Sequence, residues 1–496
     1  MPDINAVIFD LDGTLIDSEP LYREVDRLML AGQGITVAEH EWEDLIGVAG
    51  QEFIARMKDR FGIAGDPDEL LRKNNLAYLE LARGATNVFP PMRELLLQLI
   101  LAGVKLGVAS SSRRTVLDAM LAETGFDAVF TASVSSDDVE NLKPAPDAFL
   151  TIAAAMEVEP GECCVIEDSQ YGVEAAVRAG MSVVGVPAPG HEDYPSFSRA
   201  GLIFPGGAAA LNPADTLSFM GIAPAPGNPV SVSVFRETVY GHYRREDRSL
   251  PWRETLDPYK VLVSEIMLQQ TQSQRVIAKY KSFLNRFPTV EALAESSLKE
   301  VLSEWQGLGY NRRGKSLHDA ARLIAERFHG KVPESLADLR TLPGVGAYTA
   351  GAVRAFAFSR PSVFIETNIR RVMIQVFCPD RESVSDRDLF PLIGATLDHR
   401  NPRQWYYGLM DYGAYLGRSF GNANRRSRHY TRQAPLAGSV REVRGRIVAL
   451  LSETDALPLE ELERRVAPGD SRFSRAIEGL LKDGMVVSAN GSIDLP

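Results

Sequence analysis

The spacing of apolar residues divides the chain into parts with different predicted structures. In residues 1–212, short apolar runs alternate with stretches of helical periodicity, the pattern of a parallel sheet covered by helices. These runs lie at residues 6–9, 106–109, 164–166 and 182–186. From about residue 17 to 85 the pattern is helical throughout, so we expect a doubly wound α/β domain with an inserted helical cap.

The sequence changes character after residue 205. Up to residue 231 it is rich in Gly, Pro and Ala, a composition that disfavours helices and favours an extended connector. Beyond it nearly every segment has helical periodicity, as in residues 290–302 and 315–328. We therefore predict an α/β domain, a linker and an all-α domain, with boundaries at residues 1–212, 213–231 and 232–435.

Residues 436–496 show a third pattern. Three short helical stretches precede two strand-like runs joined by Asn490 and Gly491, a dipeptide typical of hairpin turns. This order predicts a small winged helix-turn-helix. Basic residues on its third helix are suited to DNA phosphates, but the segment's charge of −2 fits packing on protein equally well.

Charge is distributed unevenly along this chain of 496 residues, whose net charge is −11. Counting Lys and Arg against Asp and Glu, residues 1–230 carry −19 and residues 231–440 carry +10. The basic part can bind DNA phosphates and release counterions, whereas the acidic part is repelled by them. The alternative is that the positive charges only keep the protein soluble.

The cysteines and the apolar runs indicate a location. Cys163, Cys164 and Cys378 are the only cysteines and the adjacent pair does not bridge readily, so we expect a reducing, cytoplasmic environment. The chain leads directly into an apolar strand without a basic stretch, which argues against a signal peptide. No run of about 18 apolar residues occurs, so no membrane span is expected.

Residues that suit phosphoryl transfer follow the predicted strands. Asp10 ends the first apolar run, at the sheet edge where ligands collect, and Asp12 follows closely. Gly13 lets the backbone approach a phosphate. Phosphoryl transfer also needs oxygen-binding donors and hard ligands for Mg²⁺. The candidates for these roles are Ser110, Lys143, Glu167 and Asp168.

With the motif FDLDGTL at residues 9–15, residues 1–212 resemble the haloacid dehalogenase superfamily of phosphohydrolases. The resemblance implies that Asp10 forms an aspartyl-phosphate and that Asp12 acts as general acid and base. It also implies that Ser110 and Lys143 hold the phosphoryl group, and that Mg²⁺ is bound by Asp10, Asp12, Glu167 and Asp168.

The nearest subgroup contains β-phosphoglucomutase and the sugar-phosphate and phosphoglycolate phosphatases. Tyr22 stands where the mutases carry a lid histidine, and the basic residue of their lid loop is missing from residues 47–51. Hydrolysis is therefore favoured over mutase activity. The sequence does not identify the phosphorylated small molecule that is hydrolysed.

The all-α part carries residues that suit removal of a DNA base, which requires extrusion, protonation and stabilisation of a cationic sugar. Glu265 lies in the apolar stretch VLVSEIML at residues 261–268, so we expect a dry carboxyl that keeps a proton to donate. A structural Glu paired with an Arg gives the same pattern. The sequence LPGVG, ahead of a helix, predicts a hairpin whose Gly344 and Gly346 let backbone N–H groups meet a DNA phosphate.

Other residues of this part are candidates for the charged sugar or for DNA. Glu366 can stabilise the positive charge on the sugar, or it can simply cap a helix. DNA contacts are expected from Gln269, Gln270, Tyr310, Tyr348 and Asn368. Trp252 can stack on a base or belong to the core. Four arginines are candidate partners for DNA phosphates, or else solvated surface charges: Arg312, Arg313, Arg370 and Arg371.

Residues 232–433 resemble the adenine DNA glycosylases that act on mismatched adenine. The resemblance is carried by the hairpin and by LPWR, PYKV, SEIMLQQT and GLGY, which begin at residues 250, 258, 264 and 307. It implies that Glu265 protonates the leaving adenine. Tyr348 stands where bifunctional relatives carry a lysine, so we expect base removal without strand cleavage.

The chain departs from that family in three ways. Glu366 replaces the family's aspartate and is one methylene longer. The four-cysteine iron–sulfur signature is absent from residues 413–428, so no cluster is expected, and a basic run remains there as a DNA contact. Residues 436–496 replace the module that recognises 8-oxoguanine in the family.

The sequence therefore predicts a fusion of a Mg²⁺-dependent phosphatase with a monofunctional glycosylase. Its expected partners are double-stranded DNA with a mismatch or an oxidised base and a phosphorylated small molecule, with no membrane. Adenine opposite 8-oxoguanine or G is the leading substrate, and thymine opposite G is the second. In another interpretation, a catalytically weak glycosylase-like domain tethers the phosphatase to DNA, or the phosphatase alone matters.

Overall fold

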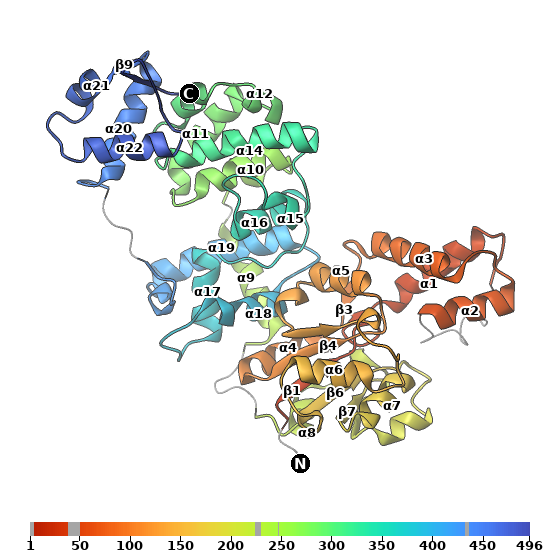
Figure 1. Ribbon diagram of the computed structural model, residues 1–496. Coiled ribbons are helices and arrows are strands. Elements are labelled where there is room, and N and C mark those ends of the chain that lie inside the picture. Colours follow the sequence, from red (N-terminus) through yellow and green to blue (C-terminus); the bar gives the residue numbers. More distant parts are fainter. Residues whose placement is uncertain (1–3, 38–49, 224–229, 247, 432–435) are drawn as a thin grey trace. The chain divides into compact units, whose positions relative to one another are not determined.

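The computed structural model describes residues 4–37, 50–223, 230–246, 248–431 and 436–496 (Figure 1). The chain forms two compact units. The first unit contains Met1–Arg245 and Pro361–Arg428, and the second contains Glu246–Arg360 and His429–Pro496. The first unit thus combines the α/β part with a segment of the all-α part.

The described residues of the α/β part contain a six-stranded parallel sheet in the order β5-β4-β1-β6-β7-β8. Its strands are β1 (Ala6–Phe9), β4 (Lys105–Ala109), β5 (Ala132–Val134), β6 (Cys163–Glu167), β7 (Ser182–Gly185) and β8 (Leu202–Ile203). The four apolar runs are therefore confirmed as strands, whereas the short strands β5 and β8 were not expected. All residues of β1 are buried, as in a central strand with both faces covered.

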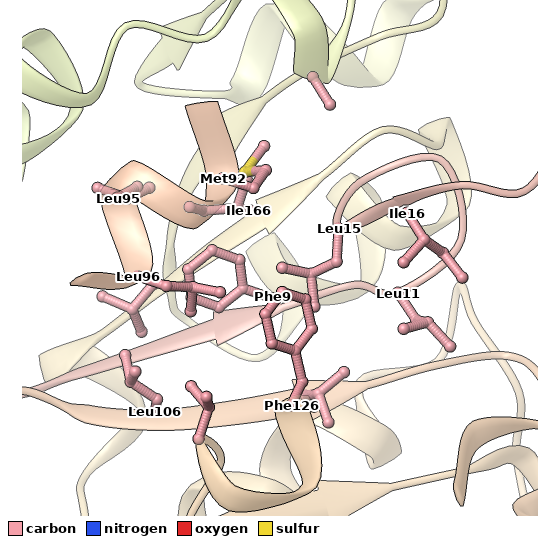
Figure 2. Close-up of a cluster of buried hydrophobic side chains, with 14 of the residues drawn as sticks. Phe9, Leu11, Leu15, Ile16, Met92, Leu95, Leu96, Leu106, Phe126 and Ile166 are labelled. Atoms are coloured by element: carbon pink, nitrogen blue, oxygen red, sulfur yellow. The ribbon is translucent and has the colours of Figure 1, made fainter. Parts of the chain in front are cut away.

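Helices cover this sheet, and their apolar side chains form its core. They are α4 (Pro90–Ala102), α5 (Arg114–Thr124), α6 (Asp147–Ala155), α7 (Gln170–Arg178) and α8 (Pro213–Phe219). Figure 2 shows Phe9 and Leu106 of the strands packed with Leu96 of α4 and with Phe126. Helix α8 begins inside the predicted linker, because Asn212 caps it and Leu217 is buried in the core.

The cap is helical, as predicted, in the residues that the structure describes. It consists of α1 (Glu19–Ala31), α2 (Gly50–Phe61) and α3 (Pro67–Ala82). These helices form an apolar cluster of their own, which includes Leu30, Ile54 and Leu71. A two-stranded antiparallel ribbon, β2 (Ile16–Asp17) paired with β3 (Asn87–Val88), joins the cap to the sheet. Residues 47–49 of the lid loop, and the side chain of Gln51, lie outside the described residues.

The helical segment of the first unit packs mainly through the contact of α17 with α19. Its helices are α9 (Val232–Glu246), α17 (Thr367–Phe377), α18 (Asp386–Thr396) and α19 (Pro402–Ser419). Phe235 of α9 makes edge-on ring contacts with Phe377 and Trp405, so α9 packs against α17 and α19.

The second unit holds the remaining helices of the all-α part. They are α10 (Pro258–Leu268), α11 (Ser273–Arg286), α12 (Val290–Ala294), α13 (Leu298–Trp305), α14 (Arg312–Phe328), α15 (Leu336–Leu339) and α16 (Ala347–Ala357). The stretch at residues 290–302 is helical, as expected, but it does not form one continuous helix. It is broken into α12 and α13, because Ser297 and Glu300 form a capping box that starts a new helix.

The C-terminal segment consists of α20 (Val440–Glu453), β9 (Leu457–Pro458), α21 (Leu459–Val466), α22 (Phe473–Lys482), β10 (Val487–Ala489) and β11 (Ser492–Asp494). The expected hairpin β10–β11 is present, with Asn490 and Gly491 at φ of 51° and 76°. Strand β9, which was not expected, adds a third antiparallel strand. Leu298 and Leu302 of α13 join the core of this segment, so it packs on the rest of the second unit.

Candidate active sites

Asp10 lies directly after β1, at the carboxyl edge of the sheet. Its Oδ1 accepts a hydrogen bond of 2.6 Å from Lys143 Nζ, which also donates to Glu167 Oε1 at 2.7 Å and to Ala109 O at 3.1 Å. Burial raises the pKa of Asp10 to about 8 although Lys143 opposes the shift. Burial by itself lowers the pKa of Lys143, but the two carboxylates raise it above its usual value. The site therefore holds a permanent cation beside the expected nucleophile.

Asp12 faces the serines that follow β4. Its Oδ2 accepts hydrogen bonds from Ser112 Oγ at 2.8 Å and from Ser110 Oγ at 3.4 Å. Its Oδ1 is buried and has no hydrogen-bond partner, and burial raises the pKa of Asp12. A raised pKa makes a carboxyl a better proton acceptor, which suits the proton-shuttle role expected of Asp12. The sequence prediction missed Ser112, although three consecutive serines after a strand were a usable signal.

Asp168 completes this carboxylate group. Burial, together with the nearby charges of Glu167 and Asp10, raises the pKa of Asp168 well above its usual value. Gly13 has φ of 76°, and a Cβ there would lie 2.1 Å from Asp168 Oδ2, so only glycine fits. Crowded, uncompensated carboxylates of this kind fit a hard divalent cation.

Glu167 takes a different role from the one that was expected. Its Oε1 accepts from Lys143, and its Oε2 accepts from Ser169 N at 2.8 Å and from Ser169 Oγ at 3.0 Å. Both oxygens are thus occupied by protein donors, and Glu167 holds Lys143 in place. Among the described residues, no three His, Cys, Asp or Glu side chains form a group that could hold a metal ion.

Tyr22 on α1 reaches this site from the cap. Its hydroxyl lies 3.4 Å from Ser112 Oγ, and its ring stacks on Tyr78 of α3 with centroids 4.0 Å apart. The pKa of Tyr22 is raised well above its usual value by burial and by the charge of Asp12. Tyr22 therefore lies beside Ser112 and Asp12 as a neutral hydroxyl.

Glu265 lies on α10 in the second unit and is 3% exposed. Its Oε2 accepts a hydrogen bond of 2.8 Å from Tyr348 OH in the first turn of α16. The expected dry setting of this carboxyl is therefore present. A phenol hydrogen bond stabilises a carboxylate more than a neutral carboxyl.

The predicted hairpin connects α15 to α16. Gln269 Nε2 donates to Gly344 O at 3.2 Å and to Thr349 Oγ1 at 3.1 Å, so the glutamine segment lies against the hairpin. Gly344 has φ of 80°, and a Cβ there would meet Ser316 at 2.8 Å. Nothing lies within 4 Å of a Cβ at Gly346, which leaves the start of α16 open to a phosphate.

Arg313 does not face outward. Its guanidinium donates to carbonyl oxygens at the end of α10 and in the 308–309 loop, and to Thr271 Oγ1 at 2.9 Å. These bonds hold two strained residues in place, since Gln270 and Tyr310 have φ of 55° and 48°. Tyr310 is 37% exposed, whereas Trp252 is 3% exposed and belongs to the core.

Glu366 lies in the first unit, as the N-cap of α17. Its Oε1 accepts from the backbone N–H groups of Asn368 at 2.7 Å and Ile369 at 2.8 Å. Burial nevertheless raises the pKa of Glu366. Asn368 Oδ1 accepts from Arg371, so its amide oxygen is already engaged. Glu366 therefore caps α17, as one of the two interpretations expected. Its Oε2 has only a long contact of 3.4 Å, with Asn368 Nδ2.

Two more of the suggested phosphate partners are tied internally. Arg370 forms a bidentate pair with Asp386 at 2.7 Å, and Arg371 donates to Gly413 O at 2.8 Å. In the second unit, Arg312 lies 3.3 Å from Asp483 and is largely exposed. Arg312 alone of this group keeps an outward position.

The segment where the family carries its cluster is held by an arginine. Arg426 donates to Cys378 O at 2.7 Å, to Pro379 O at 2.6 Å and to Arg381 O at 3.3 Å. Its guanidinium thereby satisfies carbonyls beyond the end of α17 that lack helical partners. All three cysteines of the chain are free of disulfide bonds and buried.

Comparison with known proteins assigns a family to each of the two parts that carry these sites. Residues 4–180 match the model of the haloacid dehalogenase-like hydrolases, and residues 263–388 match that of the HhH-GPD superfamily base excision DNA repair proteins. The adenine DNA glycosylase of Mycobacterium tuberculosis is 35% identical over 286 residues, which cover 51% of this chain and 91% of that protein. The chain belongs to the adenine DNA glycosylase family. Its N-terminal part is a haloacid dehalogenase-like hydrolase domain, so the predicted fusion of two hydrolases is confirmed.

Solved structures resemble each half. CbbY from Rhodobacter sphaeroides is 26% identical, with a TM-score of 0.38. The match covers 42% of this chain and 96% of the CbbY chain. A thermostable thymine-DNA glycosylase is 29% identical with a TM-score of 0.35 and covers 37% of this chain and 86% of its own. No helix in the described part of the chain is long and apolar enough to cross a membrane.

Proposed function

We propose that the glycosylase part removes adenine opposite 8-oxoguanine or G and leaves the strand intact. The observation that carries this proposal is the buried Glu265 carboxyl with its 2.8 Å hydrogen bond from Tyr348. Glu265 donates its proton to the leaving base, and Tyr348 stabilises the carboxylate that results. Because Tyr348 has no amine, no covalent link to the sugar forms.

The other residues of this part serve the sugar and the DNA. Glu366 stabilises the positive charge that develops on the sugar through its negative carboxylate. Gln270 and Tyr310, held in strained conformations, contact bases at the extruded nucleotide. The hairpin glycines Gly344 and Gly346 present backbone N–H groups to a phosphate.

A base-excision panel on the full-length protein tests this proposal. Duplexes with A opposite 8-oxoguanine, A opposite G, and T opposite G are incubated with the protein, with Glu265→Gln and with the surface control Glu295→Gln. Adenine release by the protein and the control, but not by Glu265→Gln, supports the proposal. Release of thymine but not adenine would show that thymine opposite G is the substrate. Binding without excision by any of the three proteins supports the tether interpretation and overturns catalysis.

We propose further that the N-terminal domain is a phosphomonoesterase that works through an aspartyl-phosphate. Asp10 attacks phosphorus, and Asp12 protonates the leaving oxygen and later activates water. Lys143, with Ser110, binds the phosphoryl oxygens. Mg²⁺ held by Asp10 and Asp168 supplies charge neutralisation for the incoming phosphate when it is bound. The support is the carboxylate group around Lys143 and the buried Oδ1 of Asp12, which has no hydrogen-bond partner.

Phosphate release from a substrate panel tests the second activity. The panel contains p-nitrophenyl phosphate, 2-phosphoglycolate, sugar phosphates and nucleotides, each with Mg²⁺ or with EDTA. We expect turnover that EDTA abolishes, that Asp10→Asn loses and that the exposed control Asp193→Asn keeps. Release of phosphate from 2-phosphoglycolate, a product of oxidised strand ends, would connect the two halves in one repair process. Unchanged turnover in Asp10→Asn overturns the assignment of the nucleophile.

For residues 436–496 we propose a winged helix-turn-helix arrangement, supported by the order helix, strand, helix, helix and hairpin. Arg472 pairs with Asp470 and Glu442, whereas Arg475 and Lys482 are exposed on α22. If this helix contacts DNA, replacing Arg475 and Lys482 by Ala lowers the slope of log K against log salt by about one to two. An unchanged slope leaves the segment with a packing role.

A further inference from the structure

Inside the first unit, α4 of the phosphatase domain packs directly against α18 of the glycosylase segment. Arg93 on α4 is 3% exposed, and its guanidinium donates to Gly394 O at 3.4 Å and to Ala395 O at 3.3 Å. Ala395 belongs to the apolar core of the phosphatase domain. A Cβ on Gly394 would lie 2.5 Å from Gly125 O, so the two backbones approach closely. The two parts share a core, and the linker is not their sole connection.

His399, just beyond α18, extends this contact. Its Nδ1 lies 2.9 Å from Arg93 Nη2, and its Nε2 lies 2.8 Å from Thr86 O. A guanidinium only donates, so Nδ1 accepts from it and Nε2–H donates to the carbonyl of Thr86. Burial lowers the pKa of His399 to about 3, which keeps this neutral form at ordinary pH. His399 therefore forms a fixed bridge from Arg93 to Thr86.

Thr86 lies immediately before β3, which belongs to the ribbon that joins the cap to the sheet. The cap has an apolar cluster of its own, and Val25 and Tyr78 of its helices also pack in the core of the sheet domain. The ribbon and this packing together place the cap over the sheet edge. The cap in turn brings Tyr22 to Ser112, which is hydrogen-bonded to Asp12. A displacement of the ribbon is thus transmitted to the proton shuttle.

A cavity of about 370 Å³ adjoins this contact. Asn87 and Val88 of the ribbon line it, together with Asp398 and His399 of the glycosylase segment. Continuous packing is therefore absent on this side of the ribbon in the described structure, and the hydrogen bond from His399 makes the connection. Val88 still packs against the core on the other side, so we expect loss of the bond from His399 to loosen the ribbon on the side of the cavity.

We infer that His399, a residue of the glycosylase segment, is a positioning residue of the phosphatase. It holds the β2–β3 ribbon, and through the ribbon it holds the cap and Tyr22 over Asp12. This inference rests on the phosphatase activity proposed above. It makes the glycosylase segment a structural requirement for full phosphatase activity, which a linker joining independent domains would not do.

Two substitutions in the full-length protein separate the two bonds of His399. In His399→Gln the amide nitrogen extends to the place of Nε2 and can donate to Thr86, whereas in His399→Asn the shorter amide reaches Arg93 but not Thr86. We expect His399→Asn to lower kcat/KM for 2-phosphoglycolate and p-nitrophenyl phosphate about tenfold, mainly through KM, since one buried hydrogen bond is lost. We expect His399→Gln to stay close to the parent protein.

Amide hydrogen exchange of residues 12–17 and 84–88 provides a readout that does not depend on activity. Exchange there should rise in His399→Asn and stay low in His399→Gln. Arg236→Ala is the matched control, because Arg236 donates to Thr396 O and Leu397 O in the same loop but not to the ribbon. Its ribbon exchange should stay at the parent level.

Equal exchange in His399→Asn, His399→Gln and the parent overturns the inference. So does an equal loss of kcat/KM in both His399 variants and in Arg236→Ala, which would indicate general destabilisation of the contact. If the parent protein has no phosphatase activity, the proposed function fails by itself, and the exchange measurement still decides whether His399 holds the ribbon.

Discussion

The hydrogen bond from Tyr348 to Glu265 gives the most direct quantitative prediction. Glu265 is neutral before it protonates the base and negative afterwards. A hydrogen bond to a neutral carboxyl contributes about 1 kcal/mol, and one to a charged group about 2 to 3 kcal/mol. Only the difference accelerates the reaction, because the bond is also present before the transition state. Tyr348→Phe should therefore slow base release by about 1 to 2 kcal/mol, roughly five- to thirtyfold.

Single-turnover excision from a duplex with A opposite 8-oxoguanine measures this step without product release. The expected signature is a lower rate at saturating enzyme with an unchanged Kd for the duplex, because Phe keeps the ring and removes only the hydroxyl. The double variant Tyr348→Phe with Glu265→Gln is the control. It should be no slower than the residual rate of Glu265→Gln alone, since the carboxylate that Tyr348 stabilises is already absent.

Two results would refute this reasoning. An unchanged single-turnover rate in Tyr348→Phe would show that the hydrogen bond is equally strong in both states of Glu265. A further loss in the double variant would show that Tyr348 acts on the DNA rather than through the carboxyl.

Three other predictions concern different parts of the chain. Glu366→Gln keeps an oxygen for the two N–H groups that it caps but loses the negative charge, so the single-turnover rate should fall at least about tenfold with unchanged melting temperature; an unchanged rate leaves Glu366 as a cap only. Arg426→Ala removes the donor that the carbonyl groups beyond α17 share, so it should lower the free energy of unfolding by about 1 to 3 kcal/mol. Urea titration measures this, with Arg425→Ala as the control. Equal values in both variants would show that Arg426 does not hold these carbonyl groups. Burial raises the pKa of Asp26 in the cap to about 7, although Asn74 donates to it at 2.6 Å. Its folded pKa lies above its unfolded value, so the cap loses stability as pH rises from about 4 through 7. Asp26→Asn should stabilise the cap by up to about 4 kcal/mol at pH 8 and not at pH 4, as followed by hydrogen exchange; the same gain at both pH values would contradict this.

Local sequence determined most of the elements and the candidate catalytic residues. The strands β1, β4, β6 and β7 lie where short apolar runs were expected, because a central parallel strand is buried on both faces. Asp10 and Glu265 could be named for the same reason: a carboxyl at the end of such a strand, or in an apolar helix, is conspicuous in sequence. Ser297 shows the limit, since its capping box breaks a helix that apolar periodicity makes continuous.

Only the tertiary structure decided where the long polar side chains go. Arg313, Arg371 and Arg426 look like surface cations in sequence, yet each turns inward to carbonyl oxygens from distant segments. The pairing of Arg93 with His399, and of His399 with Thr86, links residues that are far apart along the chain. The physical reason is that apolar periodicity is fixed by neighbours within one element, whereas a guanidinium or imidazole is satisfied by acceptors that exist only once separate elements have packed.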